Sequence, residues 1–141
     1  MEIEITFISD PGCPWGYSAS PSLAALQWRY GPRLTWRLVT IGLAEDASMY
    51  EARGYDPFMM GERMEMFRQF GMPFTVGPRA RLTGTGRACR AIQAVRALSP
   101  GNEITAFRAL QFGWFTTRTL MDEDENIAAA LARVPGLDVP A

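Results

Sequence analysis

Two stretches near the N-terminus alternate between apolar and polar residues, and this period predicts β-strands over residues 2–8 and 34–41. One face of each stretch is apolar: Ile3, Ile5 and Phe7 in the first, Leu34, Trp36 and Leu38 in the second. Between the strands, apolar residues recur at helical spacing from Trp15 to Tyr30, before the stop signal Gly31-Pro32. This order predicts a βαβ unit with parallel strands and a right-handed crossover.

Prolines determine where the helix of this unit begins and whether it is continuous. Asp10-Pro11-Gly12 ends the first strand, and Pro14 then falls in the first helical turn, where its missing N–H costs nothing. Pro21 lies further along the same helical pattern. The helix therefore either kinks at Pro21 or restarts there, with Ser20 as N-cap and Pro21 at the first position.

After Gly42 the apolar period is helical throughout. Four helices are predicted there, and their start signals are Pro57, Thr85, Pro100 and the capping-box pair Asp122 and Glu125. Their apolar positions are Phe58, Met60, Met64, Phe67 and Phe70; Ala88, Ile92, Val95 and Leu98; Ile104, Phe107, Leu110 and Trp114; and Ile127 and Leu131. The predicted organisation is a βαβ part at residues 1–42 and an all-helical part at residues 43–141.

The methionines from Met59 to Met72 allow two interpretations. At helical spacing they fit the core of the protein. Because methionine side chains are flexible and polarisable, the same residues also suit an adaptable surface for substrate.

Composition excludes several classes of function. The chain has 141 residues and a formal net charge of -1, which gives no overall attraction to nucleic acid or anionic membranes. It has no histidine, so a Ser-His-Asp triad, a Cys-His pair and a His-ligated zinc site are impossible. The two cysteines, Cys13 and Cys89, are too few for a four-thiolate metal site.

The beginning of the chain indicates a cytoplasmic protein. The N-terminus is acidic and alternating, unlike a signal peptide, and no stretch approaches the ~18 apolar residues that a membrane span needs. Disulfides rarely persist in the cytoplasm. A cysteine is therefore expected to act chemically rather than as a covalent link.

Cys13 is the main candidate for chemistry, because it stands between the first predicted strand and the first predicted helix. Unpaired N–H groups and the helix dipole stabilise a thiolate at such a position, and the thiolate is the nucleophilic form. Pro14 makes the first turn rigid, Trp15 offers an apolar surface beside the sulfur, and Gly12 and Gly16 leave the approach open. We predict a reactive thiol with Pro14, Trp15 and Gly16 as binding residues; the alternative is a buried structural cysteine.

The segment Phe7-x-x-Asp10-x-x-Cys13-Pro14-Trp15-Gly16-Tyr17 resembles the DsbA-like branch of the thioredoxin superfamily. That branch includes FrnE-type oxidoreductases, and kappa-class glutathione transferases and 2-hydroxychromene-2-carboxylate isomerases are relatives. Thr85-x-x-Ala88-x-Arg90 also resembles a segment that opens a helix in its inserted domain. The resemblance implies an α/β fold: a thioredoxin-like βαβ unit with an inserted all-helical domain.

Two departures from the family pattern narrow what this resemblance implies. Gly16 stands where the family motif has its second, resolving cysteine, so a mixed disulfide at Cys13 needs an external thiol such as glutathione or mycothiol. Cys89 is expected to pack within a helix rather than to resolve the disulfide. No return strands and no cis-proline loop follow Leu131, so we expect an incomplete sheet: a fragment, a truncated homologue, or a protein completed by another subunit, for example as a homodimer.

Three functions fit these residues. The first is a monothiol thiol-disulfide oxidoreductase, in which Cys13 forms mixed disulfides with a low-molecular-weight thiol or a protein substrate and no cofactor is tightly bound. The second is a glutathione-dependent transferase or isomerase of the kappa type, which needs no resolving thiol. The third is a non-catalytic thioredoxin-like module that binds partners through Trp15.

A basic turn is a weaker candidate site. Four arginines surround Thr83-Gly84-Thr85-Gly86, namely Arg79, Arg81, Arg87 and Arg90. Arginine binds carboxylates in bidentate geometry, and a helix N-terminus attracts anions, so the turn suits the carboxylates of a thiol cofactor. The alternative is a solvated basic turn without a ligand.

Overall fold

A computed structural model describes residues 2–138 of the chain. Within these residues β1 (Ile3–Ser9) and β2 (Leu34–Thr40) form a parallel pair, in register from Ile3 opposite Leu34 to Ser9 opposite Thr40. The connection contains α1 (Pro14–Ser18), α2 (Ser20–Tyr30) and the 3-10 turn η1 (Gly31–Arg33). The predicted parallel βαβ unit is therefore confirmed.

The rest of the described chain is helical, as predicted. Its elements are α3 (Ser48–Glu51), α4 (Pro57–Arg63), the 3-10 segment η2 (Met64–Phe70), α5 (Gly86–Leu98), the 3-10 turn η3 (Pro100–Asn102), α6 (Glu103–Thr116) and α7 (Asp124–Leu131). The four-residue helix α3 was not predicted. The division of the chain at residue 42 into two parts stays a prediction.

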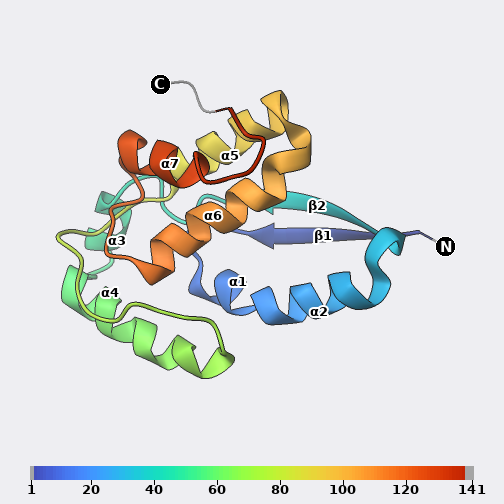
Figure 1. Cartoon of the computed structure of the whole chain (residues 1–141). Helices are drawn as coiled ribbons and strands as arrows, with labels where there is room; N and C mark the ends of the chain where they lie inside the picture. The colour runs from blue at the N-terminus through green and yellow to red at the C-terminus, as the bar shows by residue number, and fades with distance from the viewer. Residues whose placement is uncertain (1, 139–141) are drawn as a thin grey trace.

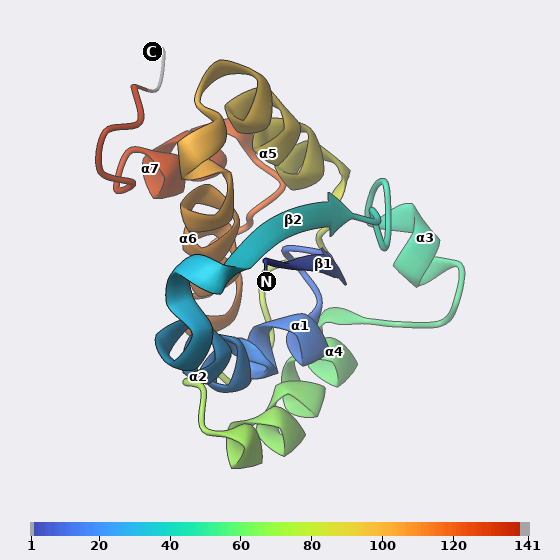
Figure 2. The same cartoon turned by 90° about the vertical axis from the view of Figure 1, so that its right-hand side faces the viewer.

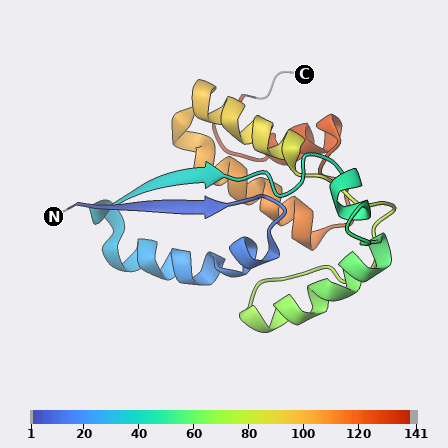
Figure 3. The same ribbon diagram turned by 180° about the vertical axis from the view of Figure 1, so that it is seen from behind.

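The helices cover one face of the two strands. Both α2 and α6 lie on the same side of the sheet, as Figure 1 and Figure 2 show, and the view from behind in Figure 3 shows no helix over the other face. Burial agrees with this arrangement, because Ile3, Ile5 and Phe7 are partly buried whereas Glu4 and Thr6 are exposed. The sheet is thus covered on one face within the described residues.

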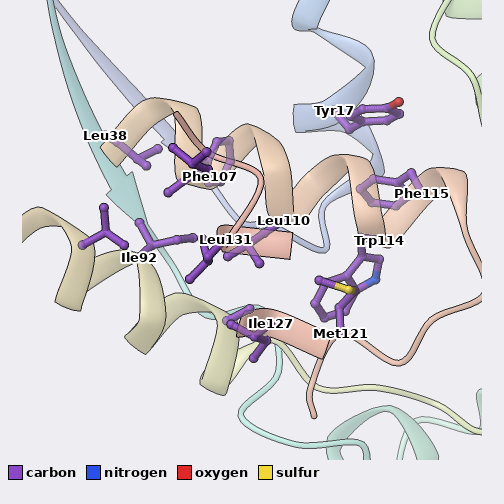
Figure 4. Packing of buried hydrophobic residues seen from close by; sticks show 14 of the residues in the cluster. Tyr17, Leu38, Ile92, Phe107, Leu110, Trp114, Phe115, Met121, Ile127 and Leu131 are labelled. Carbon is purple, nitrogen blue, oxygen red and sulfur yellow. The ribbon is translucent and has the colours of Figure 1, made fainter. Parts of the chain in front are cut away.

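The core lies where α5, α6 and α7 meet the covered face. Buried side chains from these helices and from the βαβ unit form one cluster, whose members include Tyr17, Leu38, Ile92, Phe107, Leu110, Trp114, Ile127 and Leu131 (Figure 4). The rings of Phe7 in β1 and Phe107 in α6 pack edge to face, with centroids 5.9 Å apart. The helical period of the sequence therefore identified most of the core.

Leu98 is an exception, because its side chain is 80% exposed. Ala88, Ile92 and Val95 of the same helix are buried, as predicted. At 3.6 residues per turn, Leu98 lies about a quarter turn away from the line through these three residues. The last turn of α5 therefore directs this leucine to solvent.

The helical run breaks at Ala19, and Pro21 is the second residue of the new helix α2, so the restart interpretation is closer to the structure than a kink. The N-cap of α2 is Ala19 and not Ser20, which is the first helical residue, so the predicted cap is wrong by one position. Pro21 has no N–H to donate to the carbonyl of Tyr17 four residues earlier. The Ser20 hydroxyl donates to that carbonyl instead, at 2.7 Å.

The Met-rich run divides between the core and the surface. The helix that begins at Pro57 changes from α to 3-10 geometry at Met64. Met64 and Phe67 are buried. Phe58 and Phe70, which the helical period placed on the same apolar face, are exposed, and so are Met59 and Met66. The core interpretation therefore holds for Met64, and the interpretation as a surface for substrate stays a prediction.

A buried carboxyl joins the βαβ unit to the helical part. Asp10, directly after β1, is fully buried. Its Oδ1 accepts the N–H of Gly12 at 2.8 Å, and its Oδ2 accepts the N–H of Leu43 at 2.8 Å and the hydroxyl of Thr85 at 3.0 Å. The thiol of Cys89 donates to the same Oδ2 at 3.5 Å. One side chain thus ties the turn after β1, the loop after β2 and the start of α5.

Two further predicted side-chain caps, at Thr85 and Asp122, are wrong for the same physical reason. Thr85 occupies the N-cap position of α5, but its hydroxyl bonds Asp10 and makes no cap. The N-cap of α7 is Glu123, also without a side-chain cap, and Asp122 instead forms an ion pair with Arg81 at 2.7 Å. In both cases a partner from elsewhere in the fold competes with the local capping bond.

We expect Phe107→Ala to lower the free energy of unfolding by about 3–5 kcal/mol, because it leaves a cavity beneath Phe7. The matched control is Leu98→Ala, which removes an exposed side chain and should change stability by less than about 0.5 kcal/mol. Urea denaturation followed by circular dichroism measures both values. Equal effects of the two substitutions would contradict the placement of the core.

We expect Asp10→Ala to lower the free energy of unfolding by about 3–5 kcal/mol, since it leaves several buried donors without an acceptor. Asp10→Asn keeps one acceptor oxygen and should destabilise less. Thermal denaturation of the two variants beside the wild-type protein gives the comparison. A wild-type melting temperature for Asp10→Ala would show that these bonds contribute nothing to stability.

Candidate functional site

Cys13 lies at the start of α1, as the sequence predicts. Its backbone N–H donates to the carbonyl of Asp10 at 3.0 Å, which forms a tight turn out of β1. Cys13 is the N-cap residue, and its Sγ accepts the N–H of Gly16 at 3.4 Å. The side chain is partly exposed. The turn therefore presents a sulfur atom with one backbone donor to the surface.

Pro14, Trp15 and Gly16 lie around this sulfur in the first turn of α1. The Trp15 side chain is 57% exposed, and its ring packs edge to face on Phe67 with centroids 4.8 Å apart. It also touches Phe70, at 5.7 Å between centroids. The helix of Cys13 thus contacts η2 through an indole that keeps more than half of its surface free. The binding roles of these three residues stay a prediction.

Tyr17 fixes the other end of α1. Its ring is buried and stacks on Phe115 with centroids 4.9 Å apart. Its hydroxyl donates to the carbonyl of Pro73 at 3.1 Å. Burial raises the pKa of the Tyr17 phenol, so the hydroxyl remains a donor at neutral pH.

Tyr50 is a residue near Cys13 that the sequence did not reveal. It lies in the short helix α3 and, with Gly12 and Trp114, lines a cavity of about 30 Å³. Burial raises the pKa of Tyr50, the nearby carboxyl of Asp10 adds to this effect, and Arg53 opposes it. The phenol therefore stays protonated at neutral pH. A four-residue helix is too short to give a periodic signal in the sequence.

Cys89 is buried, as expected, but its polar neighbour is the carboxyl of Asp10. Burial raises the pKa of the Cys89 thiol to about 12, and the adjacent Asp10 adds to the shift. A thiol of this kind is almost entirely protonated at neutral pH. It acts as a hydrogen-bond donor rather than as a nucleophile.

The arginines of the basic turn around Thr83 make contacts within the chain, three of them with carboxylates. Each of its four arginines has a partner among residues 2–138: Arg81 pairs with Asp122 and Glu123, Arg87 with Asp124 and Arg90 with Glu45, and Arg79 donates to the carbonyl of Trp114. These contacts use the guanidinium groups that an anion would need. The structure therefore favours the alternative of a basic turn without a ligand.

In the described part of the chain, no three Cys, Asp or Glu side chains are grouped so that they could hold a metal ion. No helix in residues 2–138 has both the length and the apolar character needed to cross a membrane.

Comparison by sequence identifies no relative: no protein-family model matches the chain, and no curated protein sequence matches it. Comparison of structures finds proteins with the same fold. A protein of Nitrosomonas europaea assigned as a protein disulfide isomerase superposes with a TM-score of 0.72 at 18% identity, over 94% of this chain and 64% of its own.

The cytosolic disulfide reductase DsbM of Pseudomonas aeruginosa is also similar in structure. With glutathione it superposes with a TM-score of 0.69 at 19% identity, over 94% of this chain and 65% of its own. A second structure of DsbM gives a TM-score of 0.66, over 92% of this chain and 63% of its own. This chain thus spans less than two thirds of the length of each of these proteins. It shares their fold, a DsbA-like thioredoxin fold in which a helical insertion follows the βαβ unit.

Proposed function

We propose that the chain carries out thiol-disulfide exchange as a monothiol enzyme, with Cys13 as the attacking residue. The observation that carries the proposal is the partly exposed Cys13 sulfur at the start of α1, with the Gly16 N–H directed at it at 3.4 Å. The similar structures support it, because their names describe a disulfide isomerase and a disulfide reductase, and one contains glutathione.

The reaction proceeds in two exchanges. The Cys13 thiolate attacks one sulfur of a disulfide, so that a new S–S bond forms and the other half of the substrate leaves as a thiolate. An external thiolate then attacks the mixed disulfide and releases Cys13 again as a thiolate. We assign glutathione or mycothiol as this external thiol and place the protein in the cytoplasm, where such thiols are kept reduced. Pro14 and Trp15 would shape the contact with the substrate.

The chain has no suitable thiol of its own to resolve a mixed disulfide at Cys13, either in Cys89 or at position 16. Cys89 is buried, and its thiol has a pKa of about 12. At position 16, a Cβ atom would overlap the hydroxyl of Ser9, which is itself buried without a hydrogen-bond partner. The space beside Cys13 that a second cysteine would occupy is thus filled by Ser9.

We expect the effects of Ser9→Ala and Gly16→Ala on stability to be coupled. Gly16→Ala improves helix propensity by up to about 1 kcal/mol, but its Cβ forces the Ser9 hydroxyl to rotate. In the Ser9→Ala background this contact is absent, so Gly16→Ala should be more favourable there by about 1 kcal/mol. A double-mutant cycle by urea denaturation measures the difference. Strictly additive effects would mean that Ser9 does not restrict position 16.

We expect the native protein to form one mixed disulfide when it is incubated with oxidised glutathione at neutral pH. Intact-mass spectrometry should show one added glutathione, and peptide mapping should place it on Cys13. Cys13→Ser should take up none, and the matched control Cys89→Ser should still take up one, because Cys89 is buried and protonated. An unmodified wild-type protein, or modification at Cys89, would overturn the proposal.

A transferase or isomerase of the kappa type is the second candidate, and the same Gly16 favours it, because bound glutathione reacts there without a resolving thiol. Conjugation of reduced glutathione to 1-chloro-2,4-dinitrobenzene, with no mixed disulfide at Cys13, would favour this reaction. If Cys13→Ser left every measured activity unchanged, the non-catalytic module that binds through Trp15 would be the better account.

A further inference from the structure

A cavity of about 440 Å³ lies between α2 and α6, over the covered face of the sheet. Its wall is largely apolar and comes from both strands and both helices: Phe7, Leu23, Trp36, Ile104 and Phe107. Small-molecule pockets have volumes of about 300–1,000 Å³ and the same character, an apolar wall with a few polar groups. The size and the lining are therefore those of a ligand pocket.

Four polar side chains line this cavity. One is Gln27, whose amide oxygen accepts the indole N–H of Trp36. The other three, Ser20, Arg108 and Gln111, also line a second cavity of about 480 Å³ between α6 and α7, and they form the polar end of the first cavity. Among the side chains that line the two cavities none is Asp or Glu. The polar end thus carries positive charge with no acidic residue in the wall, although the whole chain has a net charge of -1.

The buried side chain of Gln111 is the observation that indicates a ligand. The residue is only 2% exposed, and its Nε2 has no hydrogen-bond partner within the described chain. A buried amide without a partner costs folding free energy, and most such groups in native proteins are paired. Arg108, one turn earlier on α6, has no ion pair with a carboxylate among residues 2–138. An unpartnered buried donor and a guanidinium without a carboxylate therefore lie at the same end of an apolar cavity.

We propose that this cavity binds a small amphiphilic carboxylate, such as a medium-chain fatty acid. The apolar tail would lie against Phe7, Trp36 and Phe107, and the carboxylate would accept hydrogen bonds from Arg108 and the Gln111 amide. Arginine and carboxylate match in bidentate geometry. No residue of the turn from Asp10 to Gly16 lines the cavity, so this site is separate from Cys13 and does not depend on the proposed exchange reaction.

The test is a titration of the full chain, labelled with nitrogen-15, with sodium octanoate and with 1-octanol, which has the same tail without the charge. Octanoate should cause saturable shifts of the Trp36 indole N–H and the Gln111 side-chain amide resonances. It should bind about tenfold more tightly than octanol, because the charge-assisted contacts are absent for the alcohol. Arg108→Gln should remove this preference. Arg37→Gln, an exposed arginine on the uncovered face of the sheet, should not.

Gln111→Leu separates ligand binding from a merely structural role. Removal of the unpartnered amide should raise the melting temperature of the ligand-free protein, and it should weaken octanoate binding while octanol binding persists. The absence of saturable shifts at millimolar octanoate would overturn the proposal, as would equal affinity for octanoate and octanol. Shifts of the same resonances on dilution of the protein alone would indicate contact between two copies and would also overturn it.

Discussion

The buried carboxyl of Asp10 is the constraint on which the arrangement of this protein depends. A buried polar group is tolerated only when its hydrogen bonds are made. Asp10 meets this condition with donors that lie 33, 75 and 79 residues further along the chain, in Leu43, Thr85 and Cys89. These bonds can form together only if the loop after β2 and the start of α5 return to the end of β1. The requirement to satisfy one side chain thus holds the βαβ unit against the helical part.

Asp10 hydrogen-bonds to both cysteines, but through different groups. The carboxyl of Asp10 accepts a hydrogen bond from the Cys89 thiol, and its charge contributes to the raised pKa of that thiol. The backbone carbonyl of Asp10 accepts the backbone N–H of Cys13. This second bond fixes the turn, while the Cys13 side chain remains partly exposed. One thiol is therefore enclosed as a donor, and the other is presented at the start of a helix. The chemistry proposed for Cys13 follows from this separation.

Periodicity predicted the elements because it reflects which face of each element is buried. The period-two stretches gave β1 and β2, the period of 3.6 gave the helices, and the strand-to-helix turn placed Cys13. The predicted caps at Thr85 and Asp122 failed, since a local pattern does not reveal a distant partner such as Asp10 or Arg81.

Two features of the site could not be predicted from the sequence, because they depend on contacts between separate segments. The position of Tyr50 near Cys13 depends on how the loop after β2 folds back. The overlap of Ser9 with a Cβ at position 16 depends on how closely α1 packs on the end of β1. Neither arrangement leaves a repeating pattern of residue types, so spacing along the chain cannot predict it.

The attachment of Tyr17 has a consequence for the exchange reaction proposed at Cys13. The helix is held at its start by the turn from Asp10 and, one turn later, by the Tyr17 ring on Phe115 and the hydroxyl bond to Pro73. A segment anchored at both ends has little conformational entropy left to lose on association. The encounter with a disulfide should therefore need no ordering of this helix, and the cost of binding falls mainly on the partner that approaches Cys13.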